Sequence, residues 1–245
     1  MIRAAALLVL LWVVPASATE CRKENYAGNA YTICEVDLTR ERLELFLADK
    51  DGKTFGHFGT LDSVLAADGH KLGFATNAGM YHDDRSPVGH YLENGVEVQR
   101  VIPNAGPGNF GLLPNGVLCL REGRADVFET LTYLDQAPAC RSATQSGPML
   151  VIDGALHPRF LVDSTSRYIR NGVGTSSNGT RAVFAISDTT VTFYEFGTLF
   201  RDHLGMQNAL YFDGNISRLR APDLGRSGTG FTSLGPIIGV VEDAE

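Results

Sequence analysis

The sequence has neither an apolar run long enough to cross a membrane nor a stretch rich in lysine and arginine. Its longest apolar run, residues 4–14, has eleven residues, whereas a membrane-spanning helix needs roughly 20. The chain carries 21 basic and 28 acidic residues, a net charge of −7, and nucleic-acid binding requires a basic patch that contacts phosphates. We therefore expect no nucleic acid partner and no membrane span in the mature chain.

The short apolar run instead predicts a secretory signal. Arg3 precedes it, Pro15 ends it, and Ala16-Ser17-Ala18 fits the small residues of a cleavage site. We expect a signal peptide over residues 1–18 and one domain over residues 19–245. The mature protein is then exported to the periplasm or out of the cell.

Cysteine is scarce, and all four cysteines lie after the expected cleavage site: Cys21, Cys34, Cys119 and Cys140. An even number in an exported protein favours two disulfides. Three pairings are possible, and we prefer Cys21–Cys34 with Cys119–Cys140 because each closes a short loop. No pair has the close spacing of a zinc knuckle.

Alternating apolar residues and β-branched or aromatic residues predict several strands. Helical spacing predicts a helix over 196–204 that ends before Gly205, and shorter helices near 61–69 and 131–134. These elements indicate a single strand-rich α+β domain with a central, mostly antiparallel or mixed sheet and a few flanking helices. The predicted strands cover residues 32–37, 43–48, 96–101, 117–120, 181–187, 191–193 and the apolar run 209–212.

Glycine recurs beside polar residues at the ends of these strands. The polar segments cover residues 76–81, 108–111, 144–148, 170–174 and 213–217. Each alone is an ordinary turn, but sugars are recognised by amides, carboxylates and closely approaching backbone. The five together predict one shared pocket for a polar ligand.

Arg170 is the best candidate for binding an anion in that pocket. Its planar guanidinium can hold a phosphate or carboxylate through two parallel hydrogen bonds. Gly172 and Gly174 follow it and would let backbone N–H groups add to an anion-binding nest. The alternative is a solvated surface arginine.

One cluster has side chains that suit a divalent metal: His82, Asp83, Asp84 and His90. Adjacent residues of an extended chain point in diverging directions, which disfavours a shared ion. We expect a polar loop at the mouth of the pocket, and neither a metal nor another cofactor.

Two further motifs do not fit their usual chemistry. Ser146 lacks the Gly-x-Ser-x-Gly elbow of a serine nucleophile. Residues 106–111 match Gly-x-Gly-x-x-Gly, but Pro107 lies inside the match and no helical pattern follows. A dinucleotide site needs a strand, this turn and then a helix.

In this order, the polar segments resemble the phosphodiester glycosidase family, especially its small exported bacterial members. The resemblance runs from about residue 33 to about residue 240 and rests on Gly108-Asn-Phe-Gly111, Gln145-Ser-Gly-Pro148, Arg170-Asn-Gly-Val-Gly174 and Ala209-Leu-Tyr-Phe-Asp-Gly214. Two motifs depart from the family. Asn77-Ala78-Gly79 stands where the family often has Asn-Gly-Gly, and Asp213-Gly214-Asn215 stands where it often has Asp-Gly-Gly.

The resemblance implies an exported hydrolase that cleaves the sugar–phosphate bond of a sugar-1-phosphodiester, with a phosphodiester-linked carbohydrate as its partner. Asp213 would stabilise or attack the oxocarbenium-like carbon or activate water, Arg170 would hold the departing phosphate, and Asn77 would fix a sugar hydroxyl or phosphate oxygen. The alternative is a secreted, non-catalytic protein that binds glycans or phosphoglycans, which the altered glycines allow. The expected substrate-binding residues are Gln145, Ser146, Gly172, Gly174, Gly214, Asn215 and Ser217.

Overall fold

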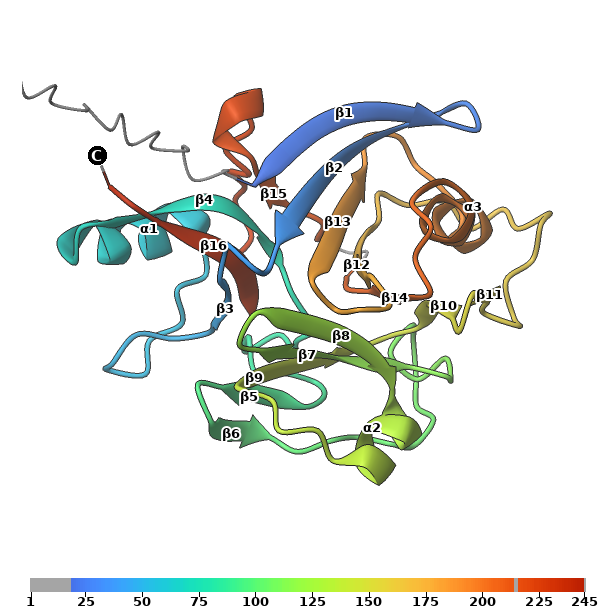
Figure 1. The fold of residues 1–245 in the computed structure, drawn as a ribbon, viewed down its shortest axis with the longest axis horizontal. Coiled ribbons are helices and arrows are strands. Elements are labelled where there is room, and N and C mark those ends of the chain that lie inside the picture. Colours follow the sequence, from blue (N-terminus) through green and yellow to red (C-terminus); the bar gives the residue numbers. More distant parts are fainter. Residues whose placement is uncertain (1–18, 214–215, 245) are drawn as a thin grey trace, which may run out of the picture.

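The computed structural model describes residues 19–213 and 216–244, which form three antiparallel sheets with helices on their outer faces (Figure 1). The largest sheet has seven strands in the order β1-β2-β13-β12-β14-β10-β11. Their bounds are β1 Glu20–Tyr26, β2 Asn29–Asp37, β13 Arg181–Ser187, β12 Asn171–Thr175, β14 Asn208–Tyr211, β10 Met149–Ile152 and β11 Ala155–Leu156.

Two smaller sheets complete the framework. The four-stranded sheet has the order β15 Leu219–Arg220, β4 His70–Asn77, β16 Ile237–Asp243 and β3 Leu43–Phe46. The five-stranded sheet has the order β6 Val96–Gln99, β5 Tyr91–Glu93, β9 Ser142–Ser146, β7 Gly116–Arg121 and β8 Arg124–Glu129. The helical segments are α1 Phe58–Ala67, α2 Thr130–Gln136, α3 Phe193–Thr198, the π-helical turn η1 Leu199–His203 and the 3₁₀ turn η2 Pro222–Leu224.

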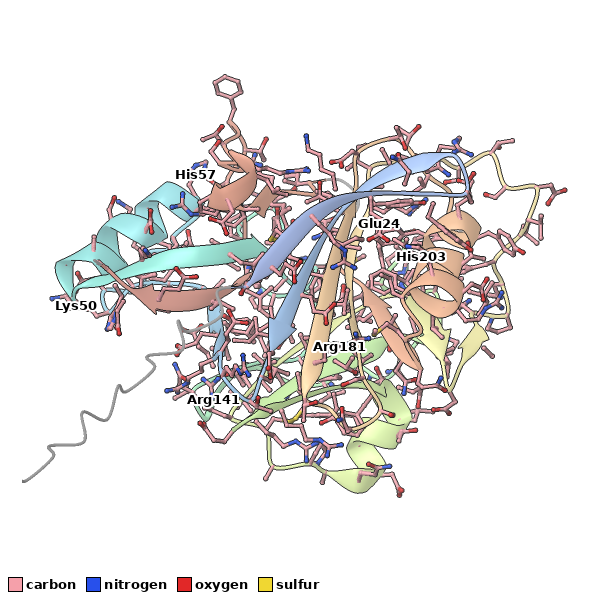
Figure 2. The ribbon with its side chains drawn as sticks, turned by 45° about the horizontal axis from the view of Figure 1, so that its top comes forward. Glu24, Lys50, His57, Arg141, Arg181 and His203 are labelled. Atoms are coloured by element: carbon pink, nitrogen blue, oxygen red, sulfur yellow. A yellow bond between two sulfur atoms is a disulfide. The ribbon has the colours of Figure 1, made fainter. Side chains whose placement is uncertain are left out.

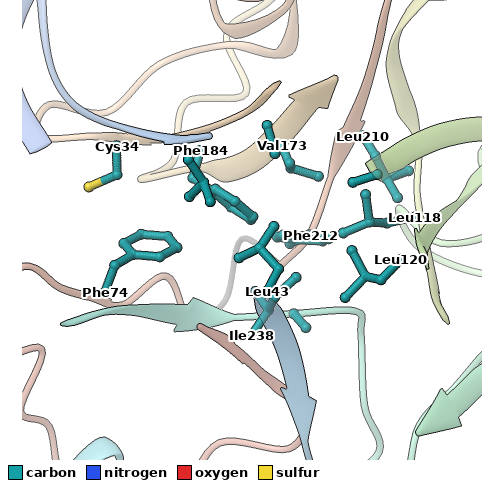
Figure 3. Close-up of a cluster of buried hydrophobic side chains, with 14 of the residues drawn as sticks. Cys34, Leu43, Phe74, Leu118, Leu120, Val173, Phe184, Leu210, Phe212 and Ile238 are labelled. Carbon is teal, nitrogen blue, oxygen red and sulfur yellow. The ribbon is translucent and has the colours of Figure 1, made fainter. Parts of the chain in front are cut away.

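The main hydrophobic core lies where the three sheets meet (Figure 3). Phe74 of β4 packs against Phe184 of β13 with ring centroids 4.9 Å apart, and Leu118 of β7 belongs to the same buried cluster. Charged side chains such as Lys50 and Arg181 lie on the outside (Figure 2). Burial of apolar surface stabilises this arrangement at about 25 cal/mol per Å².

The strand-rich α+β class is confirmed, but the strands form three sheets that share a core rather than one central sheet. All of the strand pairs between Glu20 and Asp243 that the structure describes are antiparallel.

The predicted helices are present, whereas the strand predicted at 191–193 is wrong at its end. Phe193 begins α3 because Thr192 caps it: its hydroxyl accepts the Glu195 N–H at 3.1 Å, and the Glu195 carboxylate accepts the Thr192 N–H at 2.7 Å. This reciprocal capping box is a helix start. Val191 alone forms an isolated β-bridge, with Tyr168.

Both preferred disulfides are present. Cys21–Cys34 joins the paired strands β1 and β2, and Cys119–Cys140 ties β7 to the segment before β9. Disulfides persist in oxidising compartments, which is consistent with export. Within residues 19–213 and 216–244, no helix is long and apolar enough to cross a membrane.

Candidate active site

A polar cavity of about 310 Å³ lies beside the ends of β12 and β14. Its lining residues are Met80, Asn109, Ser166, Tyr168, Arg170, Tyr211 and Asp213. A second cavity of about 520 Å³ shares Met80, Asn109 and Asp213 with it. We call the two cavities together the groove, with Asp213 where its two halves meet.

Arg170 precedes β12 and is almost fully buried, with 1% of its surface exposed. Its Nε donates to the Val191 carbonyl at 2.9 Å and its Nη2 donates to the Ser166 carbonyl at 3.1 Å. The guanidinium carbon lies 3.6 Å from the centroid of the Phe193 ring. These contacts fix the plane of the guanidinium without using a carboxylate, since none within the described residues lies within 4 Å.

The remaining nitrogen of Arg170, Nη1, has no hydrogen-bond partner within residues 19–213 and 216–244. Nine buried side-chain atoms of that part of the chain are unpaired, and three of them belong to groove residues: Arg170 Nη1, Tyr81 Oη and Tyr211 Oη. Native proteins leave few buried polar groups unpaired. Arg170 and Tyr211 are neighbours, with the guanidinium carbon 5.5 Å from the Tyr211 ring centroid, and both line the inner surface that a polar ligand in the groove would contact.

Burial lowers the pKa of Arg170, and the nearby Tyr211 partly offsets this effect. Burial, together with the negative charge of Asp213, raises the pKa of Tyr81 to about 12. The pKa of Tyr211 is likewise raised, first by burial, while Arg170 opposes and Asp213 adds to the shift. Both phenols therefore stay neutral at ordinary pH and can donate hydrogen bonds to a ligand.

The backbone around Asp213 is held from three sides. The Asn171 side-chain oxygen accepts the Asp213 N–H at 3.2 Å. Ser217 Oγ donates to the Asp213 carbonyl at 2.7 Å, and Ser146 Oγ donates to the carbonyl of Phe212 at 2.7 Å. Ser146 and Ser217 thus act on the position of Asp213 through its backbone.

Asn77 joins this arrangement from the end of β4. Its side-chain oxygen accepts the Asn171 amide at 3.0 Å and the Arg218 N–H at 2.9 Å. Asn77 Nδ2 is buried and has no hydrogen-bond partner among the described residues. Asn171, which the sequence analysis did not select as a site residue, therefore links Asn77 to Asp213.

Other expected binding residues lie elsewhere or serve the fold. The Gln145 amide is used inside the protein: Nε2 donates to the Ile102 carbonyl at 2.8 Å, and Oε1 accepts the His90 N–H at 3.0 Å. Gly172 and Gly174 lie within β12, paired to β13 and β14, rather than in an anion-binding nest. Gly214 and Asn215 lie outside the described residues.

The glycines of β12 are required for packing. A Cβ on Gly172 would approach the Leu210 carbonyl oxygen to 2.6 Å, and one on Gly174 would approach Met206 Cγ to 2.5 Å. Both distances are too short for a real Cβ contact, so the glycines let neighbouring strands and the helical layer approach closely.

The four residues with metal-ligand chemistry do not assemble into one site. His90 is buried, and its ring nitrogens lie 2.9 Å from the Gln99 carbonyl and 3.1 Å from the Tyr133 hydroxyl. Asp84 accepts hydrogen bonds from Ser86 in an exposed turn. His82 and Asp83 line the larger of the two cavities that form the groove, as expected of a polar loop beside the pocket. No group of three metal-ligating side chains occurs in the described part of the chain.

Several lining residues were not predicted from the sequence. Tyr168 lies two positions before Arg170, with its ring centroid 5.4 Å from the guanidinium carbon. Tyr211 lies two positions before Asp213 and lines the same cavity. Residues two apart on an extended chain face the same side, so this spacing was the available signal. Ser166 contributes through a long connecting segment that gives no such signal.

A model of the phosphodiester glycosidase family matches residues 70–221, more than half of the chain. The chain belongs to this family. It is also 30% identical over 214 residues to the uncharacterized protein YigE of Escherichia coli (strain K12), a match that covers 86% of this chain and 82% of the relative. The matched range includes Asn77, Arg170 and Asp213.

Solved structures share the fold. The zebrafish N-acetylglucosamine-1-phosphodiester alpha-N-acetylglucosaminidase catalytic domain, in a form auto-inhibited by its pro-peptide, superposes with a TM-score of 0.62 at 12% identity and covers 94% of this chain and 85% of its own. A hypothetical protein from Synechocystis superposes with a TM-score of 0.58 at 15% identity, covering 90% of this chain and 61% of its own. At these identities the likeness concerns the fold alone.

Proposed function

We propose that this protein is an exported hydrolase that cleaves the bond between a sugar and the phosphate of a sugar-1-phosphodiester. The observation that carries the proposal is the placement of Arg170 and Asp213 on one cavity, with Arg170 Nη1 buried and unpaired. A cation fixed by neutral carbonyls suits a phosphate, and a carboxylate beside it suits a carbon that becomes positively charged. Membership of the phosphodiester glycosidase family supports the same reaction.

The chemistry explains why one carboxylate suffices. Most glycosidases need a second carboxylic acid to protonate a poor leaving group. A phosphate monoester leaves more easily because its second pKa is about 6. As the bond between the anomeric carbon and the phosphate oxygen breaks, its electron pair leaves with the phosphate, whose charge Arg170 stabilises. Asp213 stabilises the oxocarbenium-like carbon. Water adds its oxygen to that carbon and releases one proton to the solvent, giving free sugar and a phosphate monoester.

The neutral groups of the groove hold the substrate in this proposal. Tyr81 and Tyr211 donate hydrogen bonds from buried hydroxyls that now lack acceptors. Asn171 accepts the Asp213 N–H, and Asn77 in turn accepts the Asn171 amide, so the two asparagines hold the backbone of Asp213 in place. Preorganised groups of this kind lower the barrier because they need no reorganisation during the reaction.

The test is a panel of sugar-1-phosphodiesters assayed for release of both reducing sugar and phosphate monoester. We expect turnover by the wild type and a fall in kcat of about 10²-fold or more in Asp213→Asn, with a much smaller change in KM. Asp135→Asn, an exposed position on α2, is the matched control and should behave as the wild type. Tight glycan binding without turnover by the wild type would instead identify a binding protein.

A further inference from the structure

A separate cavity is lined by several arginines, although the overall charge of the chain is negative. This cavity of about 240 Å³, here called the arginine pocket, is lined by Arg40, Arg42, Arg121, Arg124 and Arg141, among others. It shares no lining residue with either half of the groove. The net charge of the chain is −7, so this grouping is a local departure from the overall field.

Three chain segments build the arginine pocket and are tied to one another. Arg40 and Arg42 lie between β2 and β3, Arg121 and Arg124 flank the β7–β8 turn, and Arg141 lies just before β9. The backbone N–H of Arg141 donates to the Leu120 carbonyl at 2.8 Å. The side-chain Nη2 of Arg141 donates to the Leu43 carbonyl at 2.7 Å. In Figure 2, Arg141 lies beyond the arrowhead of β2, where the chain continues into the 38–42 segment.

The guanidinium groups are only partly compensated by carboxylates. Arg40 pairs with Asp37 at 3.6 Å and Arg42 pairs with Glu44 at 3.2 Å. Asp126 serves two arginines: it accepts from Arg124 Nε at 2.7 Å and also pairs with Arg121. Arg141 binds only neutral groups, the Asn94 amide oxygen at 3.0 Å and the Leu43 carbonyl. No carboxylate of residues 19–213 or 216–244 lies within 4 Å of Arg141.

The two glutamates of the lining form no ion pair with these arginines in the described part of the chain. The Glu41 carboxylate already accepts hydrogen bonds from Thr19 Oγ and the Asp37 N–H, and its burial raises its pKa. Glu122 lies exposed at the tip of the β7–β8 turn. Burial and the repulsion of Arg42 lower the pKa of Arg141. An anion in the pocket would offset the repulsion between Arg42 and Arg141.

We propose that the arginine pocket binds a doubly charged phosphate group, either inorganic phosphate or the end of a phosphate monoester. Among residues 19–213 and 216–244, the five arginines form ion pairs with only three carboxylates, Asp37, Glu44 and Asp126, so two positive charges are left without an ion pair. Guanidinium groups from separate segments match the several oxygens of a dianion. Arg121 Nε and Arg141 Nε are buried without hydrogen-bond acceptors in the described part of the chain, so the cluster is not satisfied internally. This site is independent of the function proposed for the groove.

Calorimetric titration tests the proposal, on an Arg170→Gln background that removes the guanidinium of the groove. Inorganic phosphate and glucose 1-phosphate are the two probes. We expect one phosphate per chain with a Kd of about 1 mM or tighter, weakened about tenfold or more by Arg42→Gln or Arg141→Gln. Tighter binding of one probe identifies whether the free ion or the monoester is the ligand.

The matched control is Arg201→Gln, an arginine of η1 paired with Asp202 and lining none of these cavities. It changes the net charge equally and should leave phosphate binding unchanged. Arg141 also donates to the Leu43 carbonyl, so its replacement can disturb the fold. The side chain of Arg42 pairs with Glu44, so Arg42→Gln tests the proposal even if Arg141→Gln unfolds. Absence of phosphate binding by both the wild type and folded Arg170→Gln protein, or equal weakening by Arg201→Gln, would overturn the proposal.

Discussion

Replacing Arg170 by lysine separates the charge of this residue from its shape. Lysine keeps one positive charge but has a single nitrogen, so it cannot reach the Val191 carbonyl, the Ser166 carbonyl and the ligand together. The wild-type guanidinium donates to both carbonyls, at 2.9 and 3.1 Å, and still has Nη1 for the groove. We therefore expect Arg170→Lys to lose both stability and activity.

The stability loss follows from the contacts. A hydrogen bond from a charged donor contributes about 1.5–3 kcal/mol, and one such bond is lost even if the ammonium keeps the other. The stacking on Phe193, at 3.6 Å, is also weakened. A loss of about 2–3 kcal/mol is expected, measured by denaturant unfolding. A domain of this size then melts about 4–12 °C lower.

Activity should fall about 10²-fold or more in kcat/KM on a sugar-1-phosphodiester, as for removal of one donor to a developing anion. On an activated aryl glycoside without phosphate, the same variant should be affected far less. Arg167→Lys is the matched control, because Arg167 also donates to a carbonyl, that of Thr190, but lines neither half of the groove. Equal losses on both substrates, or full activity of Arg170→Lys on the phosphodiester, would refute the assigned role.

Three further changes probe the surroundings of the site. Asn171→Ala leaves Asp213 in the chain but removes the oxygen that accepts its backbone N–H. It should lower kcat about tenfold or more relative to the wild type, measured by steady-state kinetics on folded protein. Replacing Cys119 and Cys140 together by alanine should cost about 2–5 kcal/mol in urea unfolding. Burial opposes ionisation of Asp126, but hydrogen bonds from its arginine partners outweigh it and lower its pKa. Its stabilisation is therefore present above the ordinary carboxyl pKa and lost in acid, so the wild type should lose more stability than Asp126→Asn between about pH 5 and pH 2.

Local sequence patterns predicted much of the fold because the relevant forces are local. The apolar run over 181–187, with its β-branched and aromatic residues, matches β13 residue for residue, and Gly205 has a positive φ of 67° after the helical segment. The preferred disulfides followed from short loops for the same reason. The strand predicted at 191–193 failed because the capping box of Thr192 and Glu195 outweighs β-branched character.

The site was less predictable because its contacts join distant segments. Asn171 binds Asn77, 94 positions away, and Asp213, 42 positions away, and neither contact leaves a mark in the local pattern. Composition also cannot separate an amide that faces a ligand from one that is satisfied within the protein. Gln145 belongs to the second kind, with Ile102 and His90 as partners.

Arg170 is almost fully buried, and its surroundings differ from those of most partly buried arginines in a way that favours ligand binding over structure. Arg220 pairs with Asp62 at 2.9 Å, and a carboxylate beside a guanidinium uses its charge within the fold. Arg170 is instead held by two neutral carbonyls and an aromatic face. Burying a charge without a counter-ion is costly, and a protein selected only for stability gains nothing from that cost. A bound phosphate would repay it, and Asp213 on the same cavity supplies the opposite charge on the sugar side.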